Sequence, residues 1–173
     1  MLHKIRDLQG DVIHAEDGAV GSVDDLYFDD EAWDVRYLVV NARRWMPGRK
    51  YLVSPIAIDR ERPLEPGDIR VDLTREQIAR CPTVAEESDL CSSAAVIGCG
   101  IEALDGEIGS VADLVVDDET WEITDVLVDS RQWLPGRLLL ISPQVIERID
   151  WPEKKVRLRL ARQDILQAPE VQL

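Results

Sequence analysis

The side chains that could carry chemistry in this chain of 173 residues are few. Its two histidines, His3 and His14, lie outside every recognisable motif, and its three cysteines, Cys81, Cys91 and Cys99, lack the C-x-x-C spacing of zinc or redox sites. The sequence contains no serine nucleophile elbow, no H-E-x-x-H helix and no phosphate-binding glycine loop before a helix. It therefore predicts no catalytic residue and three reduced thiols.

Two runs of three carboxylates, residues 29–31 and 117–119, are the next candidates, because adjacent carboxylates could hold a hard cation such as Ca²⁺. The alternating ligand spacing and the central glycine of a calcium loop are absent, whereas Asp side chains readily accept hydrogen bonds from turn amides. We therefore interpret both runs as turns and expect neither a metal nor a cofactor. Asp25 and Asp113, just before these runs, could be paired for acid–base work, but the sequence favours strand carboxylates bound to solvent or to a neighbouring turn.

These residues belong to a stretch that the chain contains twice, Asp17–Ile58 and Asp105–Ile146, without gaps. Such self-similarity predicts two copies of one structural unit. In each copy an Asp-Gly pair predicts a hairpin. A glycine early in the next strand, Gly21 or Gly109, is tolerated where the backbone bends or another segment passes close, so it predicts a bulge or a tight barrel corner. A nearly continuous apolar third strand then predicts a strand covered on both faces.

After each copy the sequence predicts a closing strand and a short helix. Residues 69–73 and 156–160 alternate between apolar and polar side chains, as half-exposed strands do. Thr74-Arg75-Glu76-Gln77 has the pattern of a capping box that begins a helix, and residues 162–167 are a weaker version of it. We expect one short helix at the end of each unit.

The predicted organisation is a first domain over residues 1–82, an acidic linker over 83–93 and a second domain over 94–173. The formal net charge of −14 argues against general binding to nucleic acids or anionic membranes, which depends on Lys and Arg. No apolar run is long enough to span a membrane, and the charged start lacks the core of a signal peptide, so we expect a cytoplasmic protein.

Two surface features are candidate contact sites. A Trp- and Arg-bearing loop with a Pro-Gly turn occurs in both copies, and it could be an anchor for a partner or pack between the repeats. Its residues are Arg43, Trp45 and Arg49 in the first copy and Arg131, Trp133 and Arg137 in the second. A basic stripe comprises Lys154, Lys155, Arg157 and Arg159. It is interpreted as a solvated outer face of a strand, with a local contact to RNA or an acidic protein as the alternative.

The ordered set of motifs resembles the PRC-barrel family, which is named after the photosynthetic reaction-centre H subunit and includes the barrel of the ribosome maturation factor. The closest likeness is to stand-alone bacterial proteins with two such barrels. The second copy carries the matching motifs at Asp105–Gly109, Asp117–Trp121, Trp133–Arg137 and Ile141–Pro143. The resemblance covers about residues 8–82 and 94–169. It implies an all-β chain of two small, strongly bent antiparallel barrels, used for binding rather than catalysis, with no catalytic residues to carry over.

The function expected from these features is that of a non-enzymatic adaptor or scaffold that binds an as yet unidentified protein partner through barrel surfaces and loops. Two alternatives stay open. One is an accessory factor for ribosome or RNA assembly, and the other is a small-ligand or metal-binding sensor with a cleft between the repeats. Self-association into a homo-oligomer is a further open alternative.

Overall fold

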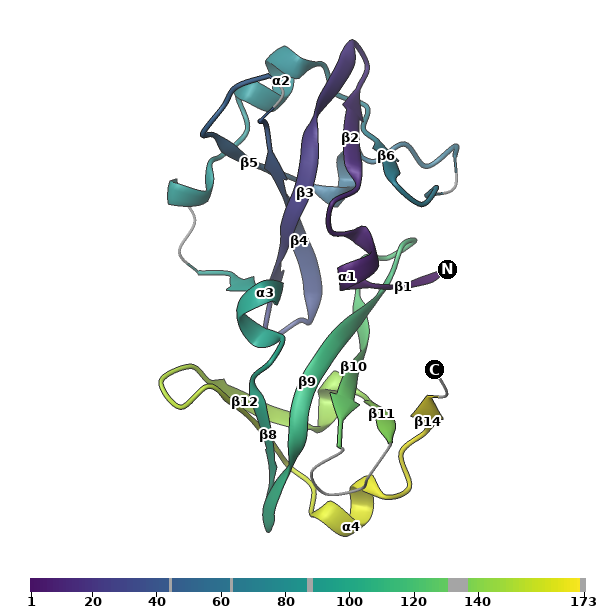
Figure 1. Ribbon diagram of the computed structural model, residues 1–173, viewed down its shortest axis with the longest axis vertical. Coiled ribbons are helices and arrows are strands. Elements are labelled where there is room, and N and C mark those ends of the chain that lie inside the picture. The colour runs from purple at the N-terminus through teal and green to yellow at the C-terminus, as the bar shows by residue number, and fades with distance from the viewer. Residues whose placement is uncertain (44, 63, 87–88, 131–136, 172–173) are drawn as a thin grey trace.

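The computed structural model describes residues 1–43, 45–62, 64–86, 89–130 and 137–171. Within them the chain is β-rich, with two sheets and a few short helices, so the predicted all-β class is confirmed. Figure 1 shows the two sheets one above the other along the long axis of the molecule. No helix in the described part of the chain is both long and apolar enough to cross a membrane.

The first sheet has the strand order β5-β4-β3-β2-β6, with β7 paired to β3. Its strands are β2 (Val12–Ala15), β3 (Gly18–Asp29), β4 (Asp34–Asn41), β5 (Lys50–Val53), β6 (Asp68–Arg70) and β7 (Cys91–Ser92). Strands β2 to β5 pair antiparallel in chain order, whereas β6 returns parallel to β2. The predicted hairpin at the first Asp-Gly pair is therefore the β2–β3 hairpin.

The second sheet has the order β12-β13-β8-β9-β10-β11-β14, with β1 paired to β9. Its strands are β1 (Leu2–Lys4), β8 (Gly100–Ala103), β9 (Gly106–Asp117), β10 (Ile123–Asp129), β11 (Leu138–Ile141), β12 (Ile146–Asp150), β13 (Lys155–Leu158) and β14 (Glu170–Val171). As in the first sheet, one closing strand, β13, runs parallel to the strand that begins the hairpin, β8.

Short helices connect and cover these strands. They are α1 (Ile5–Leu8), α2 (Arg75–Ala79), α3 (Ser93–Val96) and α4 (Arg162–Ile165), with 3₁₀ turns η1 (Pro55–Ala57), η2 (Val84–Glu86) and η3 (Pro143–Val145). The prolines that begin η1 and η3 follow Ser54 and Ser142, whose hydroxyls accept hydrogen bonds from the turn amides. A proline fits there because the first amide of a helix has no partner within it.

The strand glycines lie where β3 and β9 are bulged and crowded. Register shifts interrupt the β2–β3 pairing beside Gly21 and the β8–β9 pairing beside Gly109. A Cβ atom on Gly21 would overlap the carbonyl oxygen of Asn41, and one on Gly109 would overlap that of Asp129. The predicted bulge is therefore confirmed at both glycines, and the close approach of a carbonyl gives a physical reason for glycine there.

Buried apolar side chains form one continuous core cluster that contains residues from both sheets. The third strand of each motif is covered on both faces, as expected, because neighbouring residues that point to opposite faces are both buried: Val39 and Val40 in β4, and Leu127 and Val128 in β10. The cluster also includes Val35 and Ile123, which lie where the two sheets meet. Apolar burial thus stabilises the contact between the sheets as well as each sheet.

Helix α2 has the capping box that the sequence predicted. The Thr74 hydroxyl accepts a hydrogen bond from the amide of Gln77 (3.2 Å), and the Gln77 side chain accepts one from the amide of Thr74 (2.9 Å). At the start of α4, Asp164 accepts a hydrogen bond from the amide of Ala161 (3.2 Å), but the Ala161 side chain has no acceptor to return. The second capping box is therefore half formed.

Substitutions at the two N-cap positions, Thr74 and Ala161, should change the free energy of unfolding in opposite directions. Thr74→Ala is expected to lower the free energy of unfolding by about 1 kcal/mol, because an amide in the first turn loses its acceptor. Ala161→Ser is expected to raise it by about 0.5 to 1 kcal/mol, because it supplies the missing acceptor. Urea unfolding followed by circular dichroism measures both. A lower midpoint for Ala161→Ser would show that the second helix start is not limited by its cap.

Candidate functional site

Each sheet is joined by the short segment that precedes the first hairpin of the other sheet. Strand β1 pairs antiparallel with β9, and β7 pairs antiparallel with β3. The first arm, residues 2–8, therefore lies on the second sheet, and the second arm, residues 91–96, lies on the first. In Figure 1 helix α1 lies beside β9 and helix α3 beside β3, both at the middle of the molecule. The exchange creates the junction on which the candidate site is built.

Asp25 of β3 fixes the start of the second arm. Its carboxylate accepts hydrogen bonds from the hydroxyls of Ser92 and Ser93, the latter at 2.5 Å, and from the amide of Ala94 at 3.1 Å. It also accepts one from the amide of the next residue in β3, Leu26, at 2.8 Å. Ser93 is fully buried, so this carboxylate satisfies donors that solvent cannot reach.

Asp113 of β9 does the same for the first arm with fewer donors. It accepts hydrogen bonds from the amides of Leu114 (2.8 Å) and Arg6 (3.3 Å), and no serine stands at the start of α1. Asp113 is 3% exposed, and this burial raises its pKa although the two hydrogen bonds act in the opposite direction. Each of the two aspartates is thus bound to a crossing helix, and that is the role the geometry assigns to them.

The raised pKa of Asp113 gives stability a specific pH dependence. In the folded chain the carboxyl holds its proton to a higher pH than in the unfolded chain, so its contribution to stability is greatest in acid. That contribution is lost as pH rises from the ordinary carboxyl value through the raised one. Asp113→Asn keeps an acceptor for both amides without the buried charge. We expect the variant to gain stability relative to the original chain over that pH range, measured by urea midpoints from acid to neutral pH. An equal response in exposed Glu119→Gln would assign the effect to net charge instead.

Two tryptophans join the sheets at the junction. The carbonyl of Trp121 accepts a hydrogen bond from the amide of Val35 (2.8 Å), and the carbonyl of Trp33 accepts one from the amide of Ile123 (2.7 Å). Both tryptophans have left-handed backbone conformations, with a φ of 54° at Trp33 and 60° at Trp121. The Trp33 ring stacks on Phe28, with centroids 5.3 Å apart. The turns that carry the tryptophans are therefore built into the contact between the sheets.

The two acidic runs form the turns that precede these tryptophans. Asp29 accepts hydrogen bonds from the amides of Glu31 (2.7 Å) and Ala32 (3.0 Å). The bond from Ala32 has the larger effect and that from Glu31 the smaller, and both lower the pKa of Asp29. Asp117 accepts the corresponding bond from the amide of Glu119 (2.8 Å). Both runs act as turn caps, as the sequence predicted. Across the described residues, no three His, Cys, Asp or Glu side chains gather in a way that could hold a metal ion.

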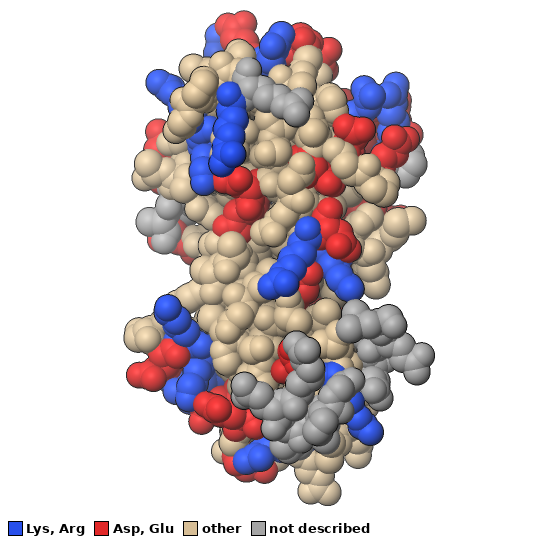
Figure 2. All heavy atoms as spheres, in the orientation of Figure 1, with Lys and Arg blue, Asp and Glu red and all other residues tan. Residues whose placement is uncertain are grey.

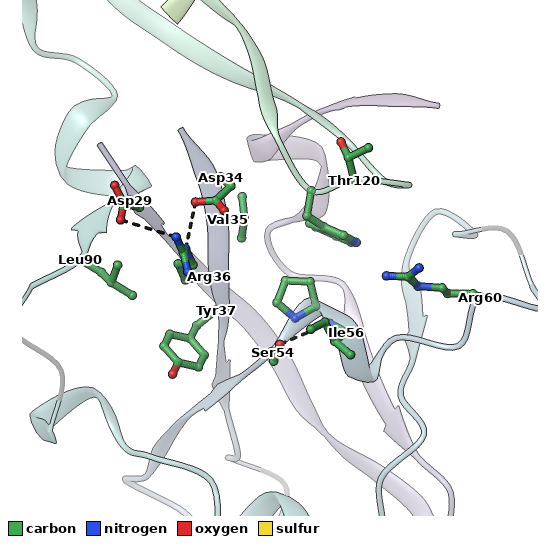
Figure 3. A pocket seen from close by; sticks show the side chains of 12 residues that line it. Asp29, Asp34, Val35, Arg36, Tyr37, Ser54, Ile56, Arg60, Leu90 and Thr120 are labelled. Atoms are coloured by element: carbon green, nitrogen blue, oxygen red, sulfur yellow. Dashed lines mark hydrogen bonds and ion pairs between the residues drawn. The ribbon is translucent and has the colours of Figure 1, made fainter. Parts of the chain in front are cut away.

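A groove of about 530 Å³ opens beside Trp121, and we call it the Trp121 groove (Figure 3). Its lining residues are Asp29, Asp34, Val35, Arg36, Tyr37, Ser54, Pro55, Ile56, Arg60, Leu90, Thr120 and Trp121. Figure 3 shows Arg36 between Asp29 and Asp34, at N–O distances of 3.7 and 2.9 Å. A second hollow of about 450 Å³ continues past Pro55 and Trp121, so the groove extends across the junction.

A groove of about 850 Å³ opens beside the other tryptophan, and we call it the Trp33 groove. Its lining residues are Asp30, Glu31, Ala32, Trp33, Glu122, Ile123, Thr124, Ser142, Pro143, Gln144, Ile146, Glu147 and Arg159. Several of these stand 88 positions after residues of the Trp121 groove, so the two grooves use related parts of the two motif copies. Acidic side chains outnumber basic ones in this second groove.

The sequence profile of the PRC-barrel domain matches residues 2–78. Residues 2–78 are a PRC-barrel domain. No curated protein sequence matches the chain. The match begins at the first arm, which lies on the other sheet, while the sheet of the PRC-barrel domain receives the second arm, residues 91–96. The matched residues 2–78 therefore include an arm that lies on the second sheet, and they lack the arm, residues 91–96, that lies on the first sheet.

The Trp-bearing loop of the PRC-barrel domain lies between β4 and β5. Trp45 is partly buried and packs against the core, and its amide donates a hydrogen bond to the carbonyl of Ala42 (3.0 Å). Arg43 and Arg49 are exposed on either side of it. The structure thus places the two arginines where a partner could reach them and uses most of the indole for packing.

The corresponding loop of the second sheet is described only at its end. The candidate residues Arg131 and Trp133 lie outside the described residues, and Arg137, directly before β11, is exposed. Whether this loop contacts a partner or the other repeat stays a prediction.

Two of the four residues of the basic stripe, Lys155 and Arg157, are paired with neighbouring carboxylates, whereas Lys154 and Arg159 are exposed. Lys155 lies 3.1 Å from Glu107 and 3.4 Å from Glu102, and its pKa is raised by hydrogen bonds to both. Arg157 lies 3.0 Å from Glu102 and 3.2 Å from Asp150. Figure 2 shows charges of both signs interspersed on one face of the molecule. At the stripe itself, the pairing of Lys155 and Arg157 reduces the positive charge available to RNA.

The cysteines are free thiols with little reactivity. Cys91 and Cys99 are buried. Burial, and after it the carboxylate of Asp30, raise the pKa of Cys91 to about 12, so almost no nucleophilic thiolate exists at neutral pH. Burial also raises the pKa of Cys81 and Cys99. These thiols are poorly suited to act as nucleophiles.

The crossing arms and the two grooves could not be predicted from the sequence. The available signal was a tryptophan at the same place in both motif copies, Trp33 and Trp121, directly after the acidic turns. In the sequence, Trp121 stands out only as the end of the motif Asp117–Trp121. Each tryptophan contributes to the junction by binding a residue of the other sheet, and a contact between distant parts of the chain leaves no local pattern in the sequence.

Proposed function

We propose that this protein is a non-enzymatic adaptor that acts in the cytoplasm and binds a protein partner at the junction between its two sheets. We also propose that the second sheet is a second PRC-barrel domain, derived from the same unit by internal duplication. Support for the duplication comes from pairs of residues 88 positions apart that have the same roles. Gly21 and Gly109 pass close to a carbonyl, and Asp25 and Asp113 bind a crossing helix.

The observation that carries the adaptor function is the pair of open grooves beside Trp33 and Trp121. Protein interfaces concentrate their binding energy in aromatic and arginine side chains set in partly enclosed sites. The Trp121 groove has Arg60 beside Ile56, which is 80% exposed, whereas Trp121 itself is 5% exposed and forms part of the groove wall. Ile56 therefore offers an exposed apolar contact at the edge of this groove.

Capture of a partner from an extract of the source cells tests this proposal. Ile56→Glu places a charge in the Trp121 groove, and Leu104→Glu makes the same change at a 69% exposed leucine on the turn between β8 and β9. Ile56→Glu is expected to reduce captured partner about tenfold or more, because a charge would be desolvated in the interface. Leu104→Glu is expected to leave capture unchanged.

The contribution of the loop is tested separately by Arg43→Ala with Arg49→Ala, two exposed positions whose truncation leaves Trp45 in place. Loss of the same partner in this variant would add the loop to the contact surface. If no protein is retained by the original chain beyond what a Leu104→Glu, Ile56→Glu double variant retains, the chain is not an adaptor through this junction.

A further inference from the structure

The Trp33 groove combines an apolar floor with an acidic rim. Trp33, Ile123 and Pro143 supply apolar surface, and Ile123 and Pro143 are buried. Exposed carboxylates stand around this surface on three different segments: the turn between β3 and β4, the start of β10 and the start of β12. The groove is therefore an open, recessed surface whose acidic side chains come from three separate segments of the chain.

Positions related by the 88-residue offset show how the same arrangement is neutralised on the opposite side. There Arg36 lies 2.9 Å from Asp34, whereas the Trp33 groove has Thr124 and Glu122 at these two positions. Asp118, on the opposite side, is paired with the terminal amine of Met1 at 2.9 Å. Its counterpart in the Trp33 groove is Asp30, which has the thiol of Cys91 as its neighbour instead of an amine.

In the Trp33 groove three carboxylates lack such partners. Within the described part of the chain, no Lys, Arg, His or terminal nitrogen lies within 4.0 Å of Glu31, Glu122 or Glu147. Arg159, exposed at the edge, is the one cation among the lining residues that the structure describes. The hydroxyl oxygen of Thr124, which lines the groove, is buried and has no hydrogen-bond partner. An unpaired buried hydroxyl is unfavourable unless a bound group completes it.

We infer that the Trp33 groove binds a lysine- or arginine-rich segment of a partner protein that also carries apolar side chains. The inference rests on the adaptor function proposed above and names the chemistry of the segment that one groove accepts. Basic side chains would pair with the three glutamates, and apolar ones would lie on Trp33. Opposite charge across an interface raises the association rate and selects the partner.

A fluorescein-labelled peptide, Lys-Lys-Lys-Leu-Leu-Lys-Lys-Lys, tests the inference by fluorescence anisotropy against the full chain. Because the whole protein is acidic, the decisive comparison is between two triple variants of equal net charge. One is Glu31→Gln, Glu122→Gln and Glu147→Gln. The other replaces three exposed glutamates that have no side-chain partner elsewhere, as Glu16→Gln, Glu65→Gln and Glu153→Gln. The first is expected to weaken binding about tenfold, and the second by about twofold or less.

A second pair of variants adds one positive charge to each groove. Thr124→Arg places an arginine where the opposite side has Arg36, and it is expected to block the peptide. Thr120→Arg makes the same change in the Trp121 groove and is expected to leave binding nearly unchanged. In a ¹H–¹⁵N spectrum the indole signal of Trp33 is expected to shift on titration and that of Trp121 to stay in place.

Three results would overturn the inference. Equal weakening by the two triple variants would assign binding to the general negative field. Equal effects of Thr124→Arg and Thr120→Arg would move the site away from the Trp33 groove. Displacement of the peptide by spermine at matched charge would indicate a polyamine site without an apolar component. Failure of the inference and failure of the adaptor function are distinguishable, because partner capture that depends on Ile56 would persist in the first case and disappear in the second.

Discussion

Gly21→Ala is expected to lower the free energy of unfolding by about 3 kcal/mol, near the upper end of overpacking effects. The backbone φ of Gly21 is not in the left-handed region, so the effect comes from space alone. A Cβ atom there would overlap the carbonyl oxygen of Asn41 and lie 3.0 Å from the Cα atom of Ala42. Because these backbone atoms of Asn41 and Ala42 cannot rotate away as a side chain could, the β3–β4 pairing would have to shift. Calorimetry should show a melting temperature lower by about 6 to 12 °C.

The corresponding change in the second sheet, Gly109→Ala, should cost more. Its Cβ would overlap the carbonyl oxygen of Asp129, and the φ of Gly109 is +149°, a conformation that side chains disfavour. Gly100→Ala is the matched control, because its Cβ would meet its nearest neighbour, a Lys155 side-chain atom, at 3.8 Å. A similar loss of stability in Gly100→Ala would show that glycine matters there for a reason other than close approach.

Asp25→Ala is expected to cost about 2 to 4 kcal/mol, because it leaves buried donors without an acceptor. The fully buried hydroxyl of Ser93 and the amides of Leu26 and Ala94 all lose a partner in this variant. Asp25→Asn keeps one acceptor oxygen and should cost about 1 kcal/mol. Urea unfolding gives the size of each effect, and faster hydrogen exchange of amides in α3 would show that the second arm is the part released.

Asp24→Ala is the control for this result. Asp24 precedes Asp25 in β3 and its carboxylate lies 2.6 Å from the ammonium of Lys50, in a pair that is half exposed. Exposed ion pairs contribute little, so its loss should cost less than about 1 kcal/mol. If Asp24→Ala and Asp25→Ala were equally destabilising, the hydrogen bonds to the second arm would not be what stabilises the junction.

Features set by neighbouring residues could be predicted from the sequence. The Asp-Gly hairpin, the bulge at Gly21, the capping box at Thr74 and the acidic turn after Asp29 each depend on a few adjacent side chains and the backbone conformations they favour. The buried third strand could also be predicted, because its apolar run is continuous. For these elements the local preference and the final structure agree.

The junction could not be predicted in the same way. Strand β1 has only the residues Leu2–Lys4, and a segment this short has no periodicity that selects one sheet over the other. Its choice depends on which sheet offers an unpaired edge and an acceptor such as Asp113. The role of Asp25 likewise depends on Ser93, 68 residues later in the chain. Contacts over such separations are decided by the whole fold.

The crossing of the arms has a consequence for how the molecule can be divided. A fragment that ends at residue 82 would keep the arm that serves the missing half and lose residues 91–96, which its own sheet requires. Two copies of that fragment could each donate residues 2–8 to the other, since the arms approach their sheets in the same antiparallel way. Such an exchange between two fragments would be a domain swap, and in the intact chain both arms cross within one polypeptide.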